Sequence, residues 1–462
     1  MLVAGIDSST QSAKAVLCRA EDGAVVAEAS APHPDGTECD PARWWDALGP
    51  ARELLARADA VAVAAQQHGM VALDDAGTVV RPALLWNDTR SAPQARALVE
   101  EFGGPGAWAR RTGSVPLASF TVSKLRWMAE HEPGHARRTA RVLLPHDWLT
   151  WRLGADEPVT DRGDASGTGY WSPATGRYVP ELARAALGHD FEPPRVARPG
   201  EAVGRTADGA LLAPGTGDNM GAALGLGLRP GDVVVSIGTS GTAFAVADEP
   251  AADPSGLVAG FADATGRFLP LVCTLNAARV LSAAAAMTGT GLAELSALAL
   301  AAEPGAGGVT LLPYLEGERT PDRPGATGVL AGLTTANATR ENIARAAVEA
   351  LLCSLADAAR HLEGQGVRPR RTLLVGGGAR SEAVRVLAPA ILGTPVTVPE
   401  PAEYVALGAA RQAAWVLAGT PGPPDWPAAP ATEYTADPLP DVRERYAALR
   451  DAAPVLDIWR NP

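Results

Sequence analysis

The chain has 462 residues, of which 47% are hydrophobic, 20% charged and 5% aromatic, a composition typical of a globular protein with two or three domains. Its formal net charge of −12 disfavours nucleic acid and anionic membranes as partners, so an anionic ligand must be held by local groups. Its four cysteines form no C-x-x-C pair, which argues against a zinc ribbon or a disulfide framework. We expect a cytoplasmic protein with neither a signal peptide nor a membrane span.

The N-terminal residues predict three consecutive strands, a helix and a buried fourth strand. Apolar runs at 2–6, 13–18 and 24–29 give the first three strands, separated by polar turns. A helix is expected from about Pro41 through Leu55. The apolar run at 60–65 then predicts a buried, parallel strand that ends at Gln66-Gln-His-Gly69.

The middle of the chain repeats the plan of its beginning. Residues 233–246 resemble residues 3–16 as strand, hydroxyl-rich tight loop and strand, with Ile237 aligned on Ile6. We interpret this as an internal duplication that gives two α/β domains; a chance likeness between two ordinary hairpins is the alternative. The expected division is 1–228 and 229–420, followed by a Pro-rich linker and C-terminal tail at 421–462.

The second half predicts a hairpin at 256–271, a long helix and another buried strand. The helix runs from Arg340 to Glu363, with Thr339 as its cap and Gly364 as its stop. The strand, Thr372–Val375, leads directly into the glycine-rich stretch Gly376-Gly-Gly-Ala-Arg-Ser381.

Two loops have the residue types that bind phosphate. Backbone N–H groups of Ser8-Ser-Thr-Gln-Ser12 and of Gly238-Thr-Ser-Gly241 can converge on phosphate oxygens, although each loop alone could be an ordinary turn. Lys14 follows the first loop. Neither Lys14 nor Lys124, the two lysines of the chain, follows a glycine, so the sequence contains no P-loop.

Two carboxylates suit phosphoryl transfer to an alcohol. Asp7 opens the first loop and could hold one Mg²⁺ together with phosphate oxygens; a turn-capping role is the alternative. Asp218, after Gly215-Thr-Gly, could take the proton of the acceptor hydroxyl; it could instead cap a helix expected at 221–228.

A third group of polar residues follows buried strands of the first half and fits a sugar. A Trp face can stack on the C–H face of a sugar, while amides, imidazole and carboxylate bind its hydroxyls. A satisfied structural histidine is the alternative for His68. The residues are Gln67, His68, Trp86, Asn87 and Asp88.

Taken in order, seven short motifs resemble the FGGY family of carbohydrate kinases over residues 2 to 415, nearly the whole chain. The motifs are Gly5-Ile-Asp-Ser-Ser-Thr-Gln-Ser-Ala-Lys14, Gln67-His-Gly69, Leu85-Trp-Asn-Asp88, Gly217-Asp-Asn219, Ser236-Ile-Gly-Thr-Ser-Gly241, Leu312-Pro-Tyr-Leu-Glu-Gly-Glu-Arg-Thr-Pro321 and Gly376-Gly-Gly-Ala-Arg-Ser381.

The resemblance implies two duplicated actin-like, ribonuclease-H-like ATPase domains with ATP and Mg²⁺ in a cleft between them. It gives catalytic roles to Asp218 as base and to Asp7, both also metal-associated. Substrate binding falls on Gln67, His68, Trp86, Asp88 and Asn219. ATP binding falls on Ser9, Thr10, Gln11, Lys14, Gly238, Thr239, Ser240, Gly377, Gly378 and Ala379.

The expected reaction is ATP-dependent phosphorylation of D-xylulose at O5. Family members that act on xylulose often carry Met at the position of Gln67, so ribulose, gluconate and glycerol stay open as acceptors. A non-catalytic actin-like ATPase, acting as a sugar sensor or chaperone, is the alternative of a different class. Sugar and ATP are the expected partners, a homodimer is one assembly the sequence allows, and Glu316 has no assigned role.

Overall fold

The computed structural model describes residues 1–452 and divides them into two compact units. The first unit contains residues 1–229, 246–270 and 402–428, and the second contains 230–245, 271–401 and the described residues from 429 onward. The chain therefore returns to the first unit near its C-terminal end and then enters the second again. Residues 453–462 of the predicted tail lie outside the described residues.

The first unit is built on a sheet with the strand order β13-β14-β5-β1-β2-β3, in which β15 also pairs with β5. β1 is antiparallel to β2 and parallel to β5. The strands are β1 (Leu2–Ser8), β2 (Ser12–Arg19), β3 (Val25–Pro32), β5 (Ala60–Ala65), β13 (Gly204–Arg205), β14 (Leu211–Leu212) and β15 (Thr216–Gly217).

The second unit contains a sheet with the order β19-β17-β16-β22-β23-β24. Its first strand, β16, is antiparallel to β17 and parallel to β22, as β1 is to β2 and β5. Ile6 lies in β1 and Ile237 in β16, so the predicted duplication is confirmed. The strands are β16 (Asp232–Ile237), β17 (Gly241–Ala245), β19 (Phe268–Thr274), β22 (Arg371–Val375), β23 (Val396–Pro399) and β24 (Ala431–Tyr434).

Helices and small two-stranded sheets complete both units. In the first unit the helices are α1 (Pro41–Ala47), α2 (Arg52–Leu55), α3 (Ala92–Glu101), α4 (Pro105–Thr112), α5 (Thr121–His131), α6 (Pro133–Arg138), α7 (Pro145–Leu153), α8 (Arg162–Ser166), α9 (Pro180–Leu187), α10 (Asp218–Gly225) and α15 (Tyr404–Ala418). In the second they are α11 (Ala278–Thr288), α12 (Leu292–Ala301), α13 (Arg340–Gly364), α14 (Glu382–Leu392) and α16 (Pro440–Ala452). The remaining strands are β4 (Glu38–Cys39), β6 (Val71–Leu73), β7 (Ala83–Leu84), β8 (Arg141–Leu143), β9 (Val159–Thr160), β10 (Trp171–Ser172), β11 (Arg177–Tyr178), β12 (Arg195–Val196), β18 (Ala259–Ala262), β20 (Thr310–Leu312) and β21 (Val329–Ala331).

The helix expected over residues 41–55 is wrong as a single element. The structure has α1, a 3-10 turn at Gly49–Ala51, and α2. Pro50 lacks an N–H group and restricts the residue before it, so an α-helix cannot continue through this point. In contrast, α13 and its Thr339 cap are confirmed, since the side chain of Thr339 accepts from Asn342 N.

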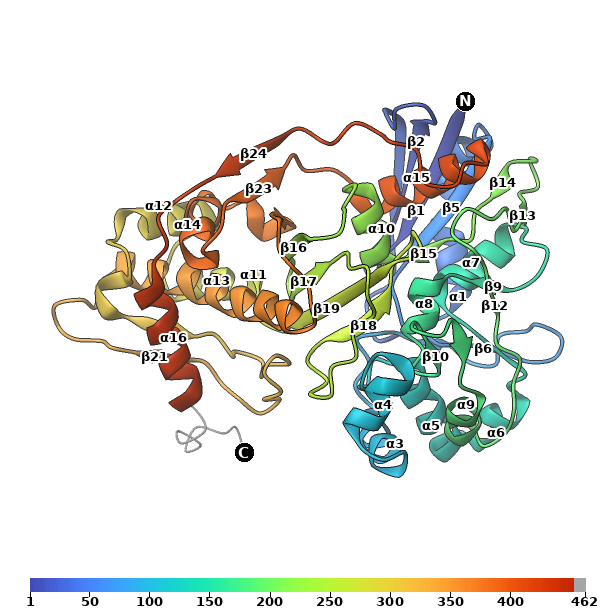
Figure 1. The fold of residues 1–462 in the computed structure, drawn as a ribbon, viewed down its shortest axis with the longest axis horizontal. Coiled ribbons are helices and arrows are strands. Elements are labelled where there is room, and N and C mark those ends of the chain that lie inside the picture. Colours follow the sequence, from blue (N-terminus) through green and yellow to red (C-terminus); the bar gives the residue numbers. More distant parts are fainter. Residues whose placement is uncertain (453–462) are drawn as a thin grey trace. The chain divides into compact units, whose positions relative to one another are not determined.

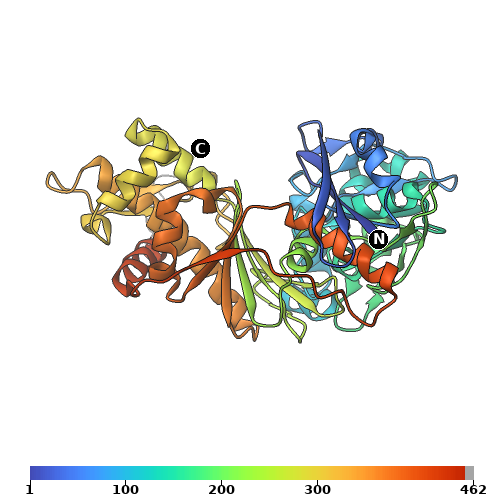
Figure 2. The same ribbon diagram turned by 90° about the horizontal axis from the view of Figure 1, so that it is seen from above.

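Helix α15 packs very closely against the first sheet and against α10. Figures 1 and 2 both show it beside β1, although the two segments lie near opposite ends of the chain. A Cβ added at Gly5 of β1 would lie 1.9 Å from the carbonyl oxygen of Ala406, and one at Gly408 would lie 1.8 Å from that of Gly221. These glycines are therefore required for the close approach of backbone to backbone.

The two faces of β1 belong to different apolar clusters. Val3 packs with the alanines of α15, whereas Ile6 belongs to a cluster that includes Trp44 of α1 and Leu149 of α7. The sheet of the first unit is thus covered on both sides, which agrees with the unbroken burial of β5.

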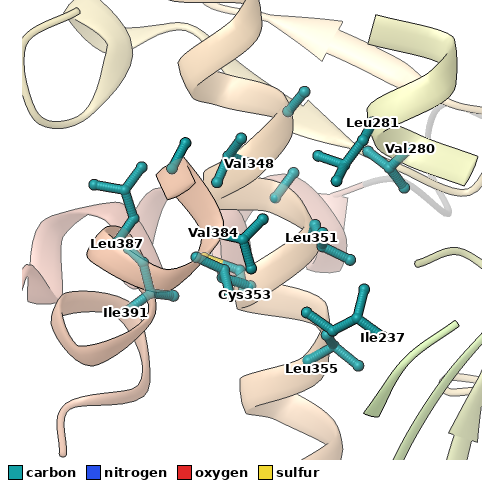
Figure 3. Close-up of a cluster of buried hydrophobic side chains, with 14 of the residues drawn as sticks. Ile237, Val280, Leu281, Val348, Leu351, Cys353, Leu355, Val384, Leu387 and Ile391 are labelled. Atoms are coloured by element: carbon teal, nitrogen blue, oxygen red, sulfur yellow. The ribbon is translucent and has the colours of Figure 1, made fainter. Parts of the chain in front are cut away.

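The core of the second unit centres on α13. Figure 3 shows Val348, Leu351 and Leu355 of this helix among side chains from α11 and α14, with Ile237 of β16 nearby. This packing buries the end of β16, from which a predicted phosphate loop begins.

Within residues 1–452, no single helix has the length and hydropathy to cross a membrane; the bent pair α11 and α12 meets that test only on length and composition.

We predict that Gly408→Ala destabilises the first unit. The new methyl group would meet the Gly221 carbonyl oxygen at 1.8 Å, and forcing α15 away from α10 should lower the free energy of unfolding by about 1–3 kcal/mol. Denaturant unfolding measures this change. Gly364→Ala is the control, because this helical glycine has no atom within 4 Å of an added Cβ; an equal loss in both variants would contradict the packing argument.

Candidate active site

Three strands of the first unit end at one edge of its sheet, and each leads into predicted site residues. Asp7 in β1 pairs with Ala64 of β5, and β15 runs parallel to the same stretch of β5. Parallel strands present their carboxyl ends together, so the loops that follow them gather at one edge. The structure therefore brings together Asp7, the pair Gln67 and His68, and Asp218.

Asp7 is a buried carboxylate without a basic partner. Its side chain accepts a hydrogen bond from Ser9 Oγ. Lys14 lies opposite it in β2, but Lys14 Nζ binds Glu403 at 2.7 Å. Among the described residues no basic group forms an ion pair with Asp7. Burial and the negative charge of Asp218 raise the pKa of Asp7 to about 7, although the hydrogen bond from Ser9 and the charge of Lys14 oppose the change.

The loop after β1 is held by two residues from other segments. His33, which the sequence analysis did not identify, donates from Nδ1 to the Ser9 carbonyl and from its backbone N–H to the Gln11 carbonyl, both at 2.8 Å. Trp86 Nε1 donates to Thr10 Oγ1 at 2.8 Å. Trp86 therefore contacts the predicted phosphate loop directly.

His68 has a left-handed backbone conformation, with φ of 66°, which is rare for a residue other than glycine. Its Nδ1 donates to the Gly167 carbonyl at 2.6 Å, and its ring packs on Phe120 with centroids 4.7 Å apart. The adjacent Gln67 donates from Nε2 to the Gly163 carbonyl at 3.3 Å. Both predicted sugar-binding residues are thus fixed by carbonyl groups at the two ends of α8.

Lys124 supports the strained backbone of His68. It is fully buried, and its Nζ donates to the carbonyls of His68 at 2.8 Å and of Ser119 at 2.6 Å. Burial lowers the pKa of Lys124 to about 7, while the negative charge of Asp88 opposes this change. The scarcity of lysine in the chain was the sequence signal that could have identified this residue.

Asp218 is the first residue of α10. The N-cap of this helix is Gly217, so the alternative that Asp218 is the N-cap is wrong. The half-buried carboxylate accepts at Oδ1 from the backbone N–H of Asn219 at 2.7 Å and from Asn219 Nδ2 at 2.8 Å. No described residue donates to Oδ2. Burial raises the pKa of Asp218 to about 6, although the bonds from Asn219 oppose the change.

Asp88 lies in a polar cluster of its own. It accepts from Arg90 Nε at 2.9 Å and from Thr37 Oγ1 at 2.8 Å, so both of its carboxylate oxygens have partners. Asn87, beside it, donates to the Gly36 carbonyl at 3.2 Å. These bonds order the loop that carries Trp86.

The two predicted nucleotide loops of the second unit adjoin each other. They follow the parallel strands β16 and β22, and Cβ atoms added at Gly376 and Gly378 would lie 2.7 Å and 2.2 Å from atoms of Ile237. The carbonyl of Gly238 accepts from Ala278 N at 2.9 Å. The predicted residues at this place are Gly238, Thr239, Ser240, Gly377, Gly378 and Ala379.

Glu316 is exposed, and the buried acid of its motif is Glu318. Glu318 accepts from the backbone N–H groups of Leu275 at 2.6 Å and Arg319 at 2.7 Å, and from Asn276 Nδ2 at 3.0 Å. Glu318 therefore ties this loop to the segment after β19.

Another polar group, which the sequence did not predict, joins α7 to the start of α8. His146 Nε2 is 3.1 Å from Asp161 Oδ1 and 3.3 Å from Asp164 Oδ2, and all three side chains are buried. We call these three residues the buried ionic cluster. The dense run of Thr, Asp, Gly and Ser at 160–168 is the sequence signal that could have revealed it.

Comparison with known proteins identifies the family of this chain. Residues 2–225 match the N-terminal domain, and residues 233–417 the C-terminal domain, of the FGGY family of carbohydrate kinases. The chain belongs to this family. The predicted two-domain, actin-like α/β fold is confirmed.

Individual relatives are similar over nearly their whole length. A xylulose kinase of Streptomyces coelicolor is 49% identical, covering 99% of this chain and 97% of the relative. A xylulose kinase of Streptomyces rubiginosus is 48% identical with the same coverage. The crystal structure of xylulose kinase from Bifidobacterium adolescentis has a TM-score of 0.91 at 46% identity, covering 97% of this chain and 99% of that one.

We predict that Asp7→Asn stabilises the protein without ligands above neutral pH. Folding raises the pKa of Asp7, so between about pH 4 and about pH 7 the folded state holds a proton that the unfolded state has lost. The free energy of unfolding therefore decreases as the pH rises through this range. Asparagine does not titrate, so the variant does not lose stability as the pH rises. The melting temperature of the Asp7→Asn variant should exceed that of the parent by a few degrees near pH 8 and by little near pH 4.

Asp35→Asn, at an exposed aspartate of the same unit, is the control for that measurement. It should leave the melting temperature unchanged at both pH values. An Asp7→Asn variant less stable than the parent near pH 8 would contradict the account of an unpaired buried carboxylate.

Proposed function

We propose that this carbohydrate kinase transfers the terminal phosphoryl group of ATP to the O5 hydroxyl of D-xylulose, giving D-xylulose 5-phosphate and ADP. The observation that carries the choice of acceptor is the near full-length similarity to xylulose kinases. The gathering of an acid, an imidazole and an amide at one sheet edge supports a polyol acceptor, because a polyol needs several directed hydrogen bonds.

Asp218 is the general base. As O5 of the sugar attacks the γ-phosphorus, the O5 proton passes to Oδ2, and the bond between the γ-phosphorus and the β,γ-bridging oxygen of ATP breaks. Asn219 occupies Oδ1 with two hydrogen bonds, which leaves Oδ2 to receive the proton. A pKa near 6 leaves the carboxylate ionised at neutral pH and still basic enough to help.

Gln67 and His68 bind the sugar. Nδ1 of His68 bonds to the Gly167 carbonyl, which holds the imidazole in one orientation beside Gln67. Trp86, which is 38% exposed, supplies an indole face for the sugar. Asn219 donates to Asp218, so its amide lies next to the base. Asp88 contributes by holding the loop that carries Trp86.

Each unit has loops of the type that holds the phosphates of ATP. In the first unit the residues are Ser9, Thr10, Gln11 and Lys14, and in the second unit they lie in the two adjoining loops after β16 and β22. These loops offer backbone N–H groups, which are the local donors that an anionic ligand needs in a chain with a net charge of −12.

The donors at this edge fit Mg²⁺. Asp7 offers a hard carboxylate oxygen that is buried and has no basic partner among the described residues, and the nearby negative charge of Asp218 adds to the attraction for a cation. Bound Mg²⁺ would neutralise charge on the phosphates of ATP. We expect the enzyme in the cytoplasm, in keeping with the free cysteines Cys18, Cys39, Cys273 and Cys353. Light scattering of the purified protein would test whether it forms a homodimer.

A sugar panel tests the acceptor, and Asp218→Asn tests the base. With ATP and Mg²⁺, ADP release should be fastest by kcat/KM on D-xylulose among D-xylulose, D-ribulose, D-gluconate and glycerol. Asp218→Asn should lower kcat about a hundredfold or more and leave D-xylulose affinity within several-fold, because asparagine cannot take the proton.

Asp156→Asn, at an exposed aspartate of the same unit, is the matched control and should keep parental turnover. Faster turnover on another acceptor would overturn the substrate, and sugar-independent ADP release would favour the non-catalytic alternative. A folded Asp218→Asn variant with parental turnover would reject Asp218 as the base.

A further inference from the structure

The buried ionic cluster lies directly against the segment that carries Asp218. Asp161 is the N-cap of α8, and its four hydrogen bonds use both carboxylate oxygens. Oδ1 accepts from His146 Nε2 at 3.1 Å and from the Asp164 N–H at 2.9 Å. Oδ2 accepts from the Gly163 N–H and from Thr216 Oγ1, both at 2.9 Å. The last of these bonds joins α8 to β15, two residues before Asp218.

Asp161 has a cationic neighbour inside the protein. Three carboxylates, Asp147, Asp161 and Asp164, surround His146 Nε2 within 3.3 Å, and their negative charges raise the pKa of His146 to about 10 against the effect of burial. The imidazole is therefore the cation beside Asp161. A buried anion with four donors, one of them cationic, can be held in one place.

The same short helix also fixes the sugar-binding pair. Gln67 donates to the carbonyl of Gly163, and His68 donates to that of Gly167. A Cβ added at Gly217 would lie 2.7 Å from both Asp164 Oδ1 and Gln67 Cγ, so β15, α8 and the Gln67 side chain are in close contact. One element thus touches the base segment on one side and the sugar-binding residues on the other.

We propose that Asp161 is a positioning residue: through the hydroxyl of Thr216 it fixes β15, and so sets the place of Asp218 relative to Gln67 and His68. This inference rests on the proposed role of Asp218 as base. Asp161 touches no reacting atom; it acts by holding two segments in register, with His146 as its buried counter-ion. Small errors in the placement of a base lower turnover more than binding, because proton transfer needs a short, directed contact.

The sharpest variant is Thr216→Val, which removes one hydroxyl at nearly constant volume and leaves Asp161 three of its donors. We expect kcat for D-xylulose to fall about tenfold and KM to stay within about twofold, since the bonds of Gln67 and His68 to α8 are untouched. Thr216→Ser, which keeps the hydroxyl, should restore most of the turnover.

Thr150→Val is the matched control. Thr150 is also fully buried, in α7 close to the same cluster, and its hydroxyl has no hydrogen-bond partner among the described residues. It should leave kcat, KM and the melting temperature near those of the parent. Melting temperatures of all variants show that the chains are folded.

Several outcomes would overturn the proposal. They are parental kcat in Thr216→Val, an equal loss in Thr150→Val, or no rescue by serine. A metal ion bound stoichiometrically to the parent and lost in Asp164→Asn would also overturn it, because the ligand atoms of the cluster lie within 4.8 Å of one another and a metal would then replace the imidazolium.

Asp218→Asn separates failure of this inference from failure of the proposed base. If Asp218→Asn loses turnover while Thr216→Val keeps it, Asp218 stands and only the positioning role is rejected. If Asp218→Asn itself keeps parental turnover, the base is rejected and the positioning role with it.

Discussion

The site of the first unit depends on one close contact, the packing of α15 against β1 and α10. Gly5 and Gly408 allow the backbones to approach so closely that a single methyl group at either place would collide with a carbonyl oxygen. β1 carries Asp7, and α10 begins with Asp218. The amide of Gln412 in α15 also binds both the N–H and the carbonyl of Gly215, each at 3.0 Å. A helix close to the C-terminal end of the chain therefore holds both carboxylates in place.

Three groups at or near this site are costly to the fold. Asp7 is a buried acid with no basic ion-pair partner within residues 1–452, Lys124 is a fully buried amine, and His68 has a left-handed backbone. Asp7 accepts from Ser9 Oγ, and Lys124 donates to the carbonyls of His68 and Ser119. Such exceptions to the rules of folding are expected where a protein binds phosphate or moves a proton, because the ligands supply the missing interactions.

Sequence patterns could predict the strands and the loops that follow them, because apolar runs ending in Ser, Thr, Gly and Asp are local signals. They also predicted Asp7, His68 and Asp218, which the structure gathers at one sheet edge. The contributions of α15 and of His146 could not be predicted in this way. They depend on contacts between segments far apart along the chain, such as Gly5 with Ala406 or Asp161 with Thr216. The break at Pro50 was a local signal that the helical periodicity concealed.

If Asp218 accepts the proton of the sugar hydroxyl, its titration must govern the pH dependence of kcat/KM for D-xylulose at saturating Mg²⁺ and ATP. With a pKa of about 6, Asp218 becomes protonated as the pH falls below that value and can no longer act as a base. We therefore expect kcat/KM to fall roughly tenfold for each pH unit below about pH 6 and to be level above it. A kcat/KM that stays constant from about pH 5 to about pH 8 would contradict it.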